Sequence, residues 1–287
     1  MSETLVHLAL PKGRMQENVM RLMGDAGIKI TFDRRGYRPS LSLDNVEAKI
    51  LKPQNIVEML QLGSRDVGFA GADWVAEKQV DLVELLDTGL DPVRIVAAAD
   101  AAFMERGGFA LDGFVVATEY MVLTERWLNA KGYNGRLVRS YGATEVFPPE
   151  DADCIVDNTA TGATLKANGL VIADEVMRSS TRLFACPKTM DNPEKRAVIE
   201  HFVMLLKSVL DARKRVMIEF NVVSAKLEEV VQILPGMREP TISSLHADNG
   251  FAVKAAVPRD GLPSLIGRIK QRGGTDILIS NFAQIIP

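Results

Sequence analysis

The chain has 287 residues, of which 47% are hydrophobic, 25% charged and 6% aromatic. These values are typical of a globular protein and exclude a disordered, fibrous or disulfide-stapled chain, and the length suggests about two domains of roughly 150 residues. Lys and Arg total 34 against 37 Asp and Glu, so the net charge of −3 argues against a nucleic-acid partner.

The N-terminal stretch MSETLVHLALPKGR has no basic segment followed by a cleavable apolar one, and no apolar run nears the ~20 residues that span a bilayer. We therefore expect a cytoplasmic protein with no membrane partner. Cys154 and Cys186 lie in apolar runs, which favours buried thiols over a disulfide or a nucleophile. The three histidines are far apart in the sequence, so we expect no structural zinc site.

The first half of the chain alternates short apolar strands with amphipathic helices. The expected elements are a strand at 6–10, a helix ending at Gly27, a strand at 48–51, a helix from Pro53 to Gly63 and a strand at 66–70. This alternation predicts crossover units around a largely parallel sheet, whose ligands gather at the carboxyl ends of the strands.

A similar pattern restarts after a glycine-containing loop at 107–113 and predicts a second α/β lobe. Strands are expected at 114–118, 136–139 and 153–157, with a helix at 119–131. The apolar runs 170–176 and 182–186 have no evident partner inside this small lobe, so we expect the chain to cross back to the first lobe. Two lobes joined by two crossings would leave a cleft.

The last third has a different order of elements. A long helix at about 193–214 precedes a strand at 216–222, a helix at 225–233, strands at 241–245 and 250–257, a helix at 262–272 and a strand at 276–280. That order, β-α-β-β-α-β, predicts a separate ferredoxin-like domain.

The stretch at 152–170, ADCIVDNTATGATLKANGL, is the strongest candidate for chemistry. An apolar strand ends at Asp157, and the small loop residues Thr159, Ala160, Thr161, Gly162, Ala163 and Thr164 lead into a helix near Leu165. Such a loop can aim backbone N–H groups at a phosphate while Asp157 holds ribose hydroxyls. An ordinary strand-to-helix turn capped by threonine is an equally good interpretation.

Three weaker candidates lie where other strands end. Lys12, Gly13 and Arg14 would suit a polyphosphate, although a solvated loop has the same composition. Gly71 permits close backbone approach and Asp73 follows it, but a tight turn with Asp73 as a helix cap explains both. Glu145 faces the cleft if there are two lobes, and its default interpretation is a solvated carboxylate at a helix start.

Together these motifs resemble ATP phosphoribosyltransferase, the first enzyme of histidine biosynthesis, in its long form with a regulatory C-terminal domain. The resemblance runs through LALPKGR, DVGFAGADWV, the D-x-x-x-T-G-x-T-L run with the following ANGL, and L-P-G-x-x-x-P-T at 234–241. It implies a two-lobed, periplasmic-binding-protein-like catalytic region followed by an ACT-like domain. Catalytic lobe I is expected at 1–98 with 181–214, lobe II at 99–180, and the regulatory domain at 215–287.

The resemblance also implies a glycosyltransferase that joins 5-phosphoribosyl 1-pyrophosphate (PRPP) to N1 of the adenine of ATP and releases pyrophosphate. Mg²⁺ would be carried mainly by the substrate phosphates. The implied site residues are Lys12, Arg14 and Glu145 for catalysis, Asp157 and 159–165 for PRPP, and Gly13, Gly71 and Asp73 for ATP. Positioning and cationic side chains can supply most of the catalysis, because adenine N1 is itself the nucleophile.

The same resemblance implies a homo-oligomer, from dimer to hexamer, that is inhibited by histidine, with AMP as a further candidate inhibitor. Histidine would bind between subunits near Asn221, Leu234 and Thr241. This chain departs from the family where it has the amide of Asn221 in place of an acid, and Asp276 could supply the missing charge.

Other functions stay open from the residues alone. Two lobes around a cleft also describe solute-binding proteins and ligand sensors, although a secreted receptor should carry an export segment and a sensor normally adds a DNA-binding module. A phosphoribosyltransferase for another acceptor base is excluded only through the resemblance, whereas the intact phosphate loop argues against a catalytically silent regulatory subunit.

Overall fold

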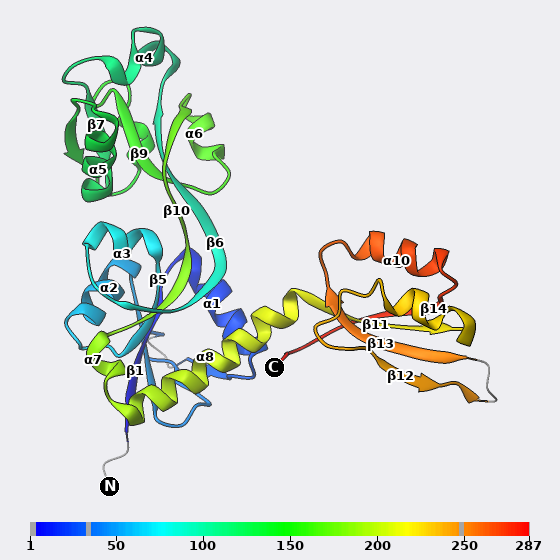
Figure 1. Ribbon diagram of the computed structural model, residues 1–287. Helices are drawn as coiled ribbons and strands as arrows, with labels where there is room; N and C mark the ends of the chain where they lie inside the picture. Colours follow the sequence, from blue (N-terminus) through cyan, green and yellow to red (C-terminus); the bar gives the residue numbers. More distant parts are fainter. Residues whose placement is uncertain (1–3, 33–35, 247–249, 287) are drawn as a thin grey trace. The chain divides into compact units, whose positions relative to one another are not determined.

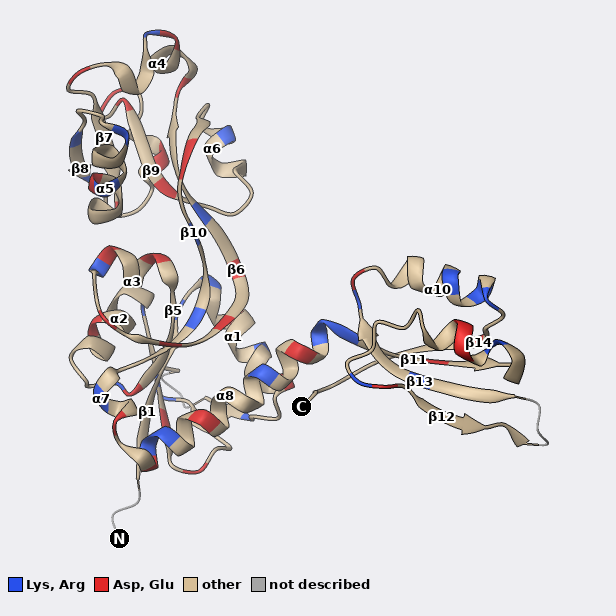
Figure 2. Ribbon diagram, in the orientation of Figure 1, with Lys and Arg blue, Asp and Glu red and all other residues tan. Residues whose placement is uncertain are grey.

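The computed structural model describes residues 4–32, 36–246 and 250–286. These residues form two compact units (Figure 1). The first contains the residues up to Arg21 together with Ile28–Glu200, and the second contains Leu22–Gly27 and the chain from His201 onward. Figure 2 shows basic and acidic segments interspersed on both units, in keeping with the nearly balanced charge of the sequence. No helix of the described residues is long and apolar enough to cross a membrane.

The first lobe of the first unit is built on parallel strands. β1 (Val6–Pro11) pairs in parallel with β4 (Val46–Leu51) and β5 (Val67–Gly71). The strands are largely buried because helices pack on them, as Ile56 of α2 does against Ala9. The remaining elements of this lobe are α1 (Arg14–Asp25), α2 (Pro53–Gln61), α3 (Ala72–Lys78), α7 (Pro187–Met190), the start of α8 (Pro193–Arg213), β2 (Ile30–Thr31) and β3 (Ser40–Leu41).

Two long antiparallel strands join the lobes, and the sequence predicted neither at its full length. β6 (Val83–Ala99) had no expected counterpart, and β10 (Val171–Ala185) merges the two runs expected at 170–176 and 182–186. Its last residues pair with β5, which confirms that the chain crosses back to the first lobe. The register of β6 and β10 shifts on both sides of Thr181, the first residue of β10 that pairs with β5.

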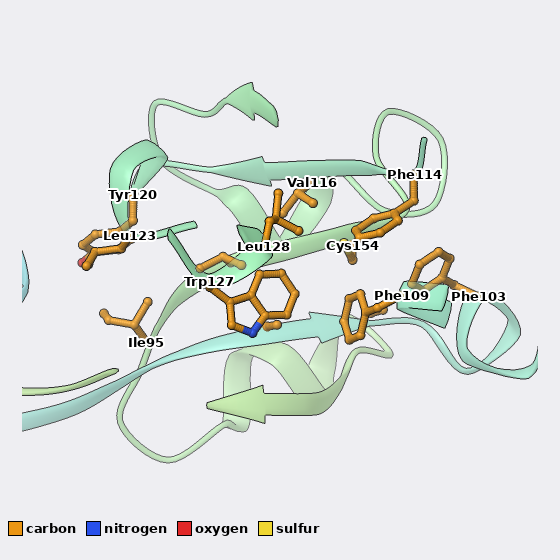
Figure 3. Close-up of a cluster of buried hydrophobic side chains, with 13 residues drawn as sticks. Ile95, Phe103, Phe109, Phe114, Val116, Tyr120, Leu123, Trp127, Leu128 and Cys154 are labelled. Carbon is orange, nitrogen blue, oxygen red and sulfur yellow. The ribbon is translucent and has the colours of Figure 1, made fainter. Parts of the chain in front are cut away.

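The second lobe continues the same sheet, whose full strand order is β4-β1-β5-β10-β6-β9-β7-β8. Its core is an aromatic cluster of Phe103, Phe109, Phe114 and Trp127 (Figure 3), in which successive ring centroids lie 5.2–5.8 Å apart. The elements of this lobe are α4 (Ala101–Glu105), η1 (Gly108–Ala110), β7 (Val115–Thr118), α5 (Met121–Lys131), β8 (Arg136–Arg139), η2 (Thr144–Val146), β9 (Cys154–Thr159) and α6 (Ala163–Ala167).

The second unit contains the expected ferredoxin-like domain. Its antiparallel sheet has the strand order β12-β13-β11-β14, which is the order of a β-α-β-β-α-β unit. The strands are β11 (Arg215–Val222), β12 (Thr241–Ser244), β13 (Phe251–Pro258) and β14 (Thr275–Asn281), and the helices are η3 (Ser224–Lys226), α9 (Leu227–Val231) and α10 (Leu262–Gln271).

One helix of this domain is shorter than expected. The single helix predicted over 225–233 is replaced by η3 and the five-residue α9. Pro235 explains the early end, because a proline disfavours helical backbone at the residue before it. The chain instead turns through Leu234, whose backbone N–H donates to the carbonyl of Val231.

Candidate active site

Two neighbouring pockets lie in the first unit, where the strand ends of both lobes meet. The first has a volume of about 310 Å³ and the second about 300 Å³. Arg14 and Asn158 line both pockets, so the two cavities share a wall. The first pocket is also lined by Lys12, Met15, Pro53, Gly71, Asp73, Trp74, Asp91, Val93, Tyr120 and Ser179–Thr181, and the second by Glu145, Asp157, Thr159–Thr161 and Ala163–Leu165.

The structure brings the predicted PRPP residues together around the second pocket. All of them line it except Gly162, which lies in the same loop with a φ of +81°. Glu145, from the η2 turn, joins them there. The expected cluster of small hydroxyl residues is therefore assembled on one cavity, together with two carboxylates and the side chain of Arg14.

The turn at 159–163 is capped by its own threonines. The backbone N–H of Gly162 donates to Oγ1 of Thr159 at 2.9 Å, and that of Ala163 donates to Oγ1 of Thr161 at 3.3 Å. The sequence allowed two interpretations of this stretch, a threonine-capped turn or a loop that surrounds a ligand pocket. In the structure the same residues form both. Because each threonine oxygen accepts a backbone N–H, its hydroxyl hydrogen can donate to a ligand.

Asp157 is the most electrostatically perturbed group of the second pocket. Burial raises its pKa to about 6, a hydrogen bond from the backbone N–H of Asn158 lowers it, and the nearby charges of Glu119 and Glu145 raise it further. Acids with a pKa shifted in this way cluster at functional sites.

Of the residues predicted to bind ATP, Gly71 and Asp73 line the first pocket and Gly13 does not, while two of the predicted catalytic residues, Lys12 and Arg14, line it as well. Lys12 and Arg14 line it from the loop between β1 and α1, with Gly13 between them at a φ of +87°. Lys12 donates to the Tyr37 hydroxyl at 3.1 Å. Gly71 must lack a side chain, because a Cβ atom there would lie 2.1 Å from Oδ1 of Asp73.

Asp73 is buried within a network that the sequence did not reveal. Its Oδ2 accepts from the Tyr120 hydroxyl at 2.8 Å, and its Oδ1 accepts from Oγ of Ser179 at 2.7 Å. Tyr120 lies two residues after the end of β7, so the tendency of ligands to gather at the carboxyl ends of strands could have identified it. Ser179 lies within β10 and has no comparable sequence signal.

No group of three or more His, Cys, Asp or Glu that could hold a metal exists among the described residues. The two carboxylates of the second pocket, Asp157 and Glu145, are nevertheless hard oxygen ligands of the type that Mg²⁺ prefers. They fit a magnesium ion that keeps most of its ligands as water and substrate phosphate. Cys154 and Cys186 are free and buried as predicted, and burial raises the pKa of the Cys154 thiol, so it cannot serve as a thiolate nucleophile.

The predicted histidine-site residues are only partly brought together. Nδ2 of Asn221 donates to Oδ2 of Asp276 at 3.0 Å, and Oγ1 of Thr275 donates to the same oxygen. Both hydrogen bonds lower the pKa of Asp276. Thr241 pairs with the β13 residue Lys254, while Leu234 packs on the apolar core of the domain.

Comparison with known proteins identifies the family. The family model described as ATP phosphoribosyltransferase matches residues 52–208, and the model for its C-terminal domain matches residues 212–284. The chain belongs to the ATP phosphoribosyltransferase family. Because both models match one chain, it has the long form of the family. Membership assigns it to the pentosyltransferases and to the first step of histidine biosynthesis.

Relatives in the ATP phosphoribosyltransferase family align along nearly the whole length of the chain. The enzyme from Chlorobium phaeobacteroides is 34% identical over 289 residues, covering 99% of this chain and 98% of the relative. The enzyme from Pelotomaculum thermopropionicum is 34% identical over 287 residues, covering 98% and 99%. A solved chain from the "ATP phosphoribosyl transferase (HisG:HisZ) complex from Thermotoga maritima" has a TM-score of 0.64 at 27% identity, covering 72% of this chain and 99% of that one.

Proposed function

We propose that this chain transfers the phosphoribosyl group of PRPP to N1 of the adenine of ATP, with PRPP in the second pocket and ATP in the first. The observation that carries the proposal is the pair of adjoining pockets with Arg14 and Asn158 in their common wall. A reaction between two bound substrates needs such a geometry, because the reacting atoms must meet where the two cavities join.

The second pocket suits the donor sugar. Its threonine hydroxyls, at Thr159, Thr161 and Thr164, supply hydrogen-bond donors for the 5-phosphate. Asp157 lies in β9, two residues before its last residue, Thr159, and its carboxylate would accept hydrogen bonds from the ribose hydroxyls. The glycine at position 162 lets the loop backbone adopt its positive φ of +81°.

The first pocket suits the nucleotide. Lys12 and Arg14 line it with two cations, which favours the triphosphate. The missing side chain at Gly71 makes room for the carboxylate of Asp73 beside it. The buried carboxylate of Asp73 provides a fixed hydrogen-bond acceptor in its wall.

The chemistry follows from this placement. The lone pair of adenine N1 forms a bond to C1 of the ribose while the bond from C1 to the pyrophosphate oxygen breaks. Positive charge builds on the sugar and negative charge on the leaving group, so Asp157 would stabilise the first and Arg14, in the shared wall, the second. Mg²⁺ held by the phosphates, with Asp157 and Glu145 as available ligands, would neutralise further charge on pyrophosphate.

The test is an absorbance assay for phosphoribosyl-ATP with purified protein, ATP, PRPP, Mg²⁺ and pyrophosphatase. Product that requires all components supports the proposal. A lack of product under every condition would overturn it and favour a binding protein or a silent regulatory subunit.

The loop assignment predicts a selective loss of PRPP use. Gly162→Val should raise the KM for PRPP at least tenfold, because valine is strained at a φ of +81° and its Cβ would also contact Ile172 at 3.6 Å. Thr161→Ala should raise the same KM by a factor of roughly five to ten through loss of one donor. Steady-state kinetics with PRPP varied would measure both effects. The exposed Thr31→Ala is the matched control, and wild-type PRPP kinetics in both loop variants would refute the assignment.

We also propose that residues 215–287 form a regulatory domain that binds histidine between subunits of a homo-oligomer, a hexamer built from dimers, while 1–98 with 181–214 and 99–180 form the catalytic lobes. The contact between Asn221 and Asp276 supports this, because it places a carboxylate beside the amide found where the family has an acid. Asp276 would then bind a cationic group of histidine.

This assignment predicts that Asp276→Ala abolishes inhibition by millimolar histidine and leaves turnover without histidine unchanged. The physical reason is the loss of the only charge on the Asn221–Asp276 pair. Allosteric coupling between an inhibitor site and a substrate site is typically about 1–3 kcal/mol. Dose–response curves for histidine would measure it, with Asp260→Ala, an exposed acid of the same domain, as control. Inhibition left intact in Asp276→Ala would show that Asp276 does not supply the charge.

A further inference from the structure

A continuous chain of hydrogen bonds connects the two pockets. From Oδ2 of Asp73 it runs to the Tyr120 hydroxyl at 2.8 Å, then to Nδ2 of Asn158 at 3.2 Å, and from the same nitrogen to Oδ1 of Asp157 at 3.2 Å. Tyr120 lines only the first pocket, and Asp157 lines only the second. A substitution at Tyr120 can therefore affect the Asp157 carboxylate in the other cavity through the hydrogen bonds of Asn158.

Tyr120 is held in place from several sides. Its side chain is almost completely buried, and its ring stacks on Trp74 at a centroid distance of 4.8 Å. Figure 3 shows Tyr120 at the edge of the aromatic cluster, with its hydroxyl pointing away from the other rings. Burial raises the pKa of Tyr120, and the neighbouring charge of Asp73 raises it further. The hydroxyl therefore stays protonated and donates a hydrogen bond to Asp73.

A second contact holds the two lobes in register beside this chain. The buried carboxylate of Glu77, on α3 of the first lobe, accepts from the backbone N–H groups of Val122 and Leu123 at 3.0 Å. Those groups belong to the first turn of α5 in the second lobe, where a helix has unpaired donors. Asp73 and Glu77, both on α3, thus fix the position of Tyr120 just before α5.

We propose that Tyr120 is a positioning residue that acts on the phosphoribosyl pocket through Asn158. The amide of Asn158 has two N–H hydrogens, and with Tyr120 in place one is directed to the tyrosine oxygen and the other to Asp157. Without the hydroxyl the amide loses one of its two anchors, and the Asp157 carboxylate loses a fixed neighbour. The inference rests on the proposed function, because it concerns how Asp157 is held over the donor sugar.

The test compares Tyr120→Phe with Tyr133→Phe. The first keeps the ring and its stacking on Trp74 and removes only the hydroxyl. The second removes a hydroxyl from a tyrosine in the aromatic cluster, stacked on Phe109 at 5.5 Å and outside both pockets. We expect kcat/KM for PRPP to fall about tenfold in Tyr120→Phe, the loss of one hydrogen bond in a charged network, and to stay at the wild-type value in Tyr133→Phe.

A double-mutant cycle separates this role from a purely structural one. If Tyr120 acts through Asn158, Asn158→Ala should abolish the effect of Tyr120→Phe on kcat/KM for PRPP, so that the double variant is no worse than Asn158→Ala. Independent, multiplying effects, or an effect on ATP use alone, would overturn the inference. Melting temperatures of all variants would show whether a loss of activity merely follows a loss of stability.

The outcomes distinguish this inference from the proposed function. If the wild-type protein makes phosphoribosyl-ATP and Tyr120→Phe keeps the wild-type kcat/KM for PRPP, the positioning role is wrong and the function stands. If the wild-type protein makes no product, the proposed function fails and the positioning role fails with it.

Discussion

Asp157→Asn is expected to lower kcat/KM for PRPP by roughly 100- to 1000-fold while making the folded chain more stable at pH 7. Activity falls because a neutral amide cannot balance the positive charge that develops on the ribose. Stability rises because ionising a half-buried carboxylate is costly. Its pKa of about 6, against an ordinary value of 3.8, corresponds to about 3 kcal/mol once the group is ionised.

The sign of the pH dependence follows from the raised pKa. The folded chain binds the Asp157 proton more tightly than the unfolded chain does, so stability falls as the pH rises from about 4 to about 6. The stability advantage of Asp157→Asn should therefore be full above pH 6 and vanish near pH 4. Wild-type kcat/KM should decline as the pH falls through about 6, where the carboxylate becomes protonated, and the variant should lack this decline.

The matched control for this experiment is Asp151→Asn, which makes the same change at an exposed acid six residues earlier in the chain. It should change neither the activation free energy for PRPP use nor the free energy of unfolding by more than about 0.5 kcal/mol. An Asp157→Asn variant with wild-type activity, or one that is less stable than the wild type at pH 7, would contradict the role assigned to this carboxylate.

Lys195→Met is expected to destabilise the first unit by about 3 kcal/mol. Nζ of Lys195 donates to Oδ1 of Asp66 at 2.8 Å, and the Asp66 side chain is only 5% exposed. Asp66 also accepts from the backbone N–H of His7 and from Oγ1 of Thr189. Removing the lysine would leave a buried carboxylate without its cation, and the loss of a partner costs more than an intact pair contributes.

The pKa of Asp66 determines the pH range in which its ion pair with Lys195 stabilises the fold. Burial alone would raise it, but the hydrogen bonds from Lys195, His7 and Thr189 outweigh burial and leave it lowered. A lowered pKa means that the stabilisation is complete above the ordinary value of 3.8 and is lost as the pH falls below it. The destabilisation by Lys195→Met should therefore be complete at neutral pH and shrink as the pH falls into the acid range.

Urea denaturation followed by tryptophan fluorescence measures this effect selectively, because both tryptophans, Trp74 and Trp127, lie in the first unit. Lys78→Met is the control, since it removes a lysine of the same unit whose partner, Glu58, belongs to an exposed pair. Equal losses in the two variants would show that burial of Asp66 adds nothing.

Local sequence signals were sufficient for elements whose pattern is carried by neighbouring residues. The sequence of β11 alternates residues that are buried in the structure with more exposed ones, and turns follow on either side. These local signals allowed the ferredoxin-like order of strands and helices to be predicted. The loop from Asp157 to Leu165 was found because strand, small residues and helix follow one another without interruption. Such signals work where a single segment contains the whole motif.

The long strand β6 was missed because its sequence contains turn residues. Gly89, Asp91 and Pro92 interrupt the apolar pattern, and both Gly89 and Asp91 have positive φ values. Tertiary contacts override this local preference: Oδ2 of Asp91 accepts from Oγ1 of Thr181 at 2.9 Å, and Oδ1 accepts from Nδ2 of Asn18 at 2.6 Å. β10 was divided in the prediction for the same reason, since Ser179, Ser180 and Thr181 lie at its centre.

The sequence by itself determined the family, the alternation of elements in both lobes and the residues of the phosphate loop, because each is encoded within a contiguous stretch. The tertiary structure alone decided that Asp73, Tyr120 and Ser179 form one buried network and that two pockets share Arg14 and Asn158. Asp73 and Ser179 are 106 positions apart. Contacts at that separation depend on how two long strands cross between the lobes, and no local pattern records that crossing.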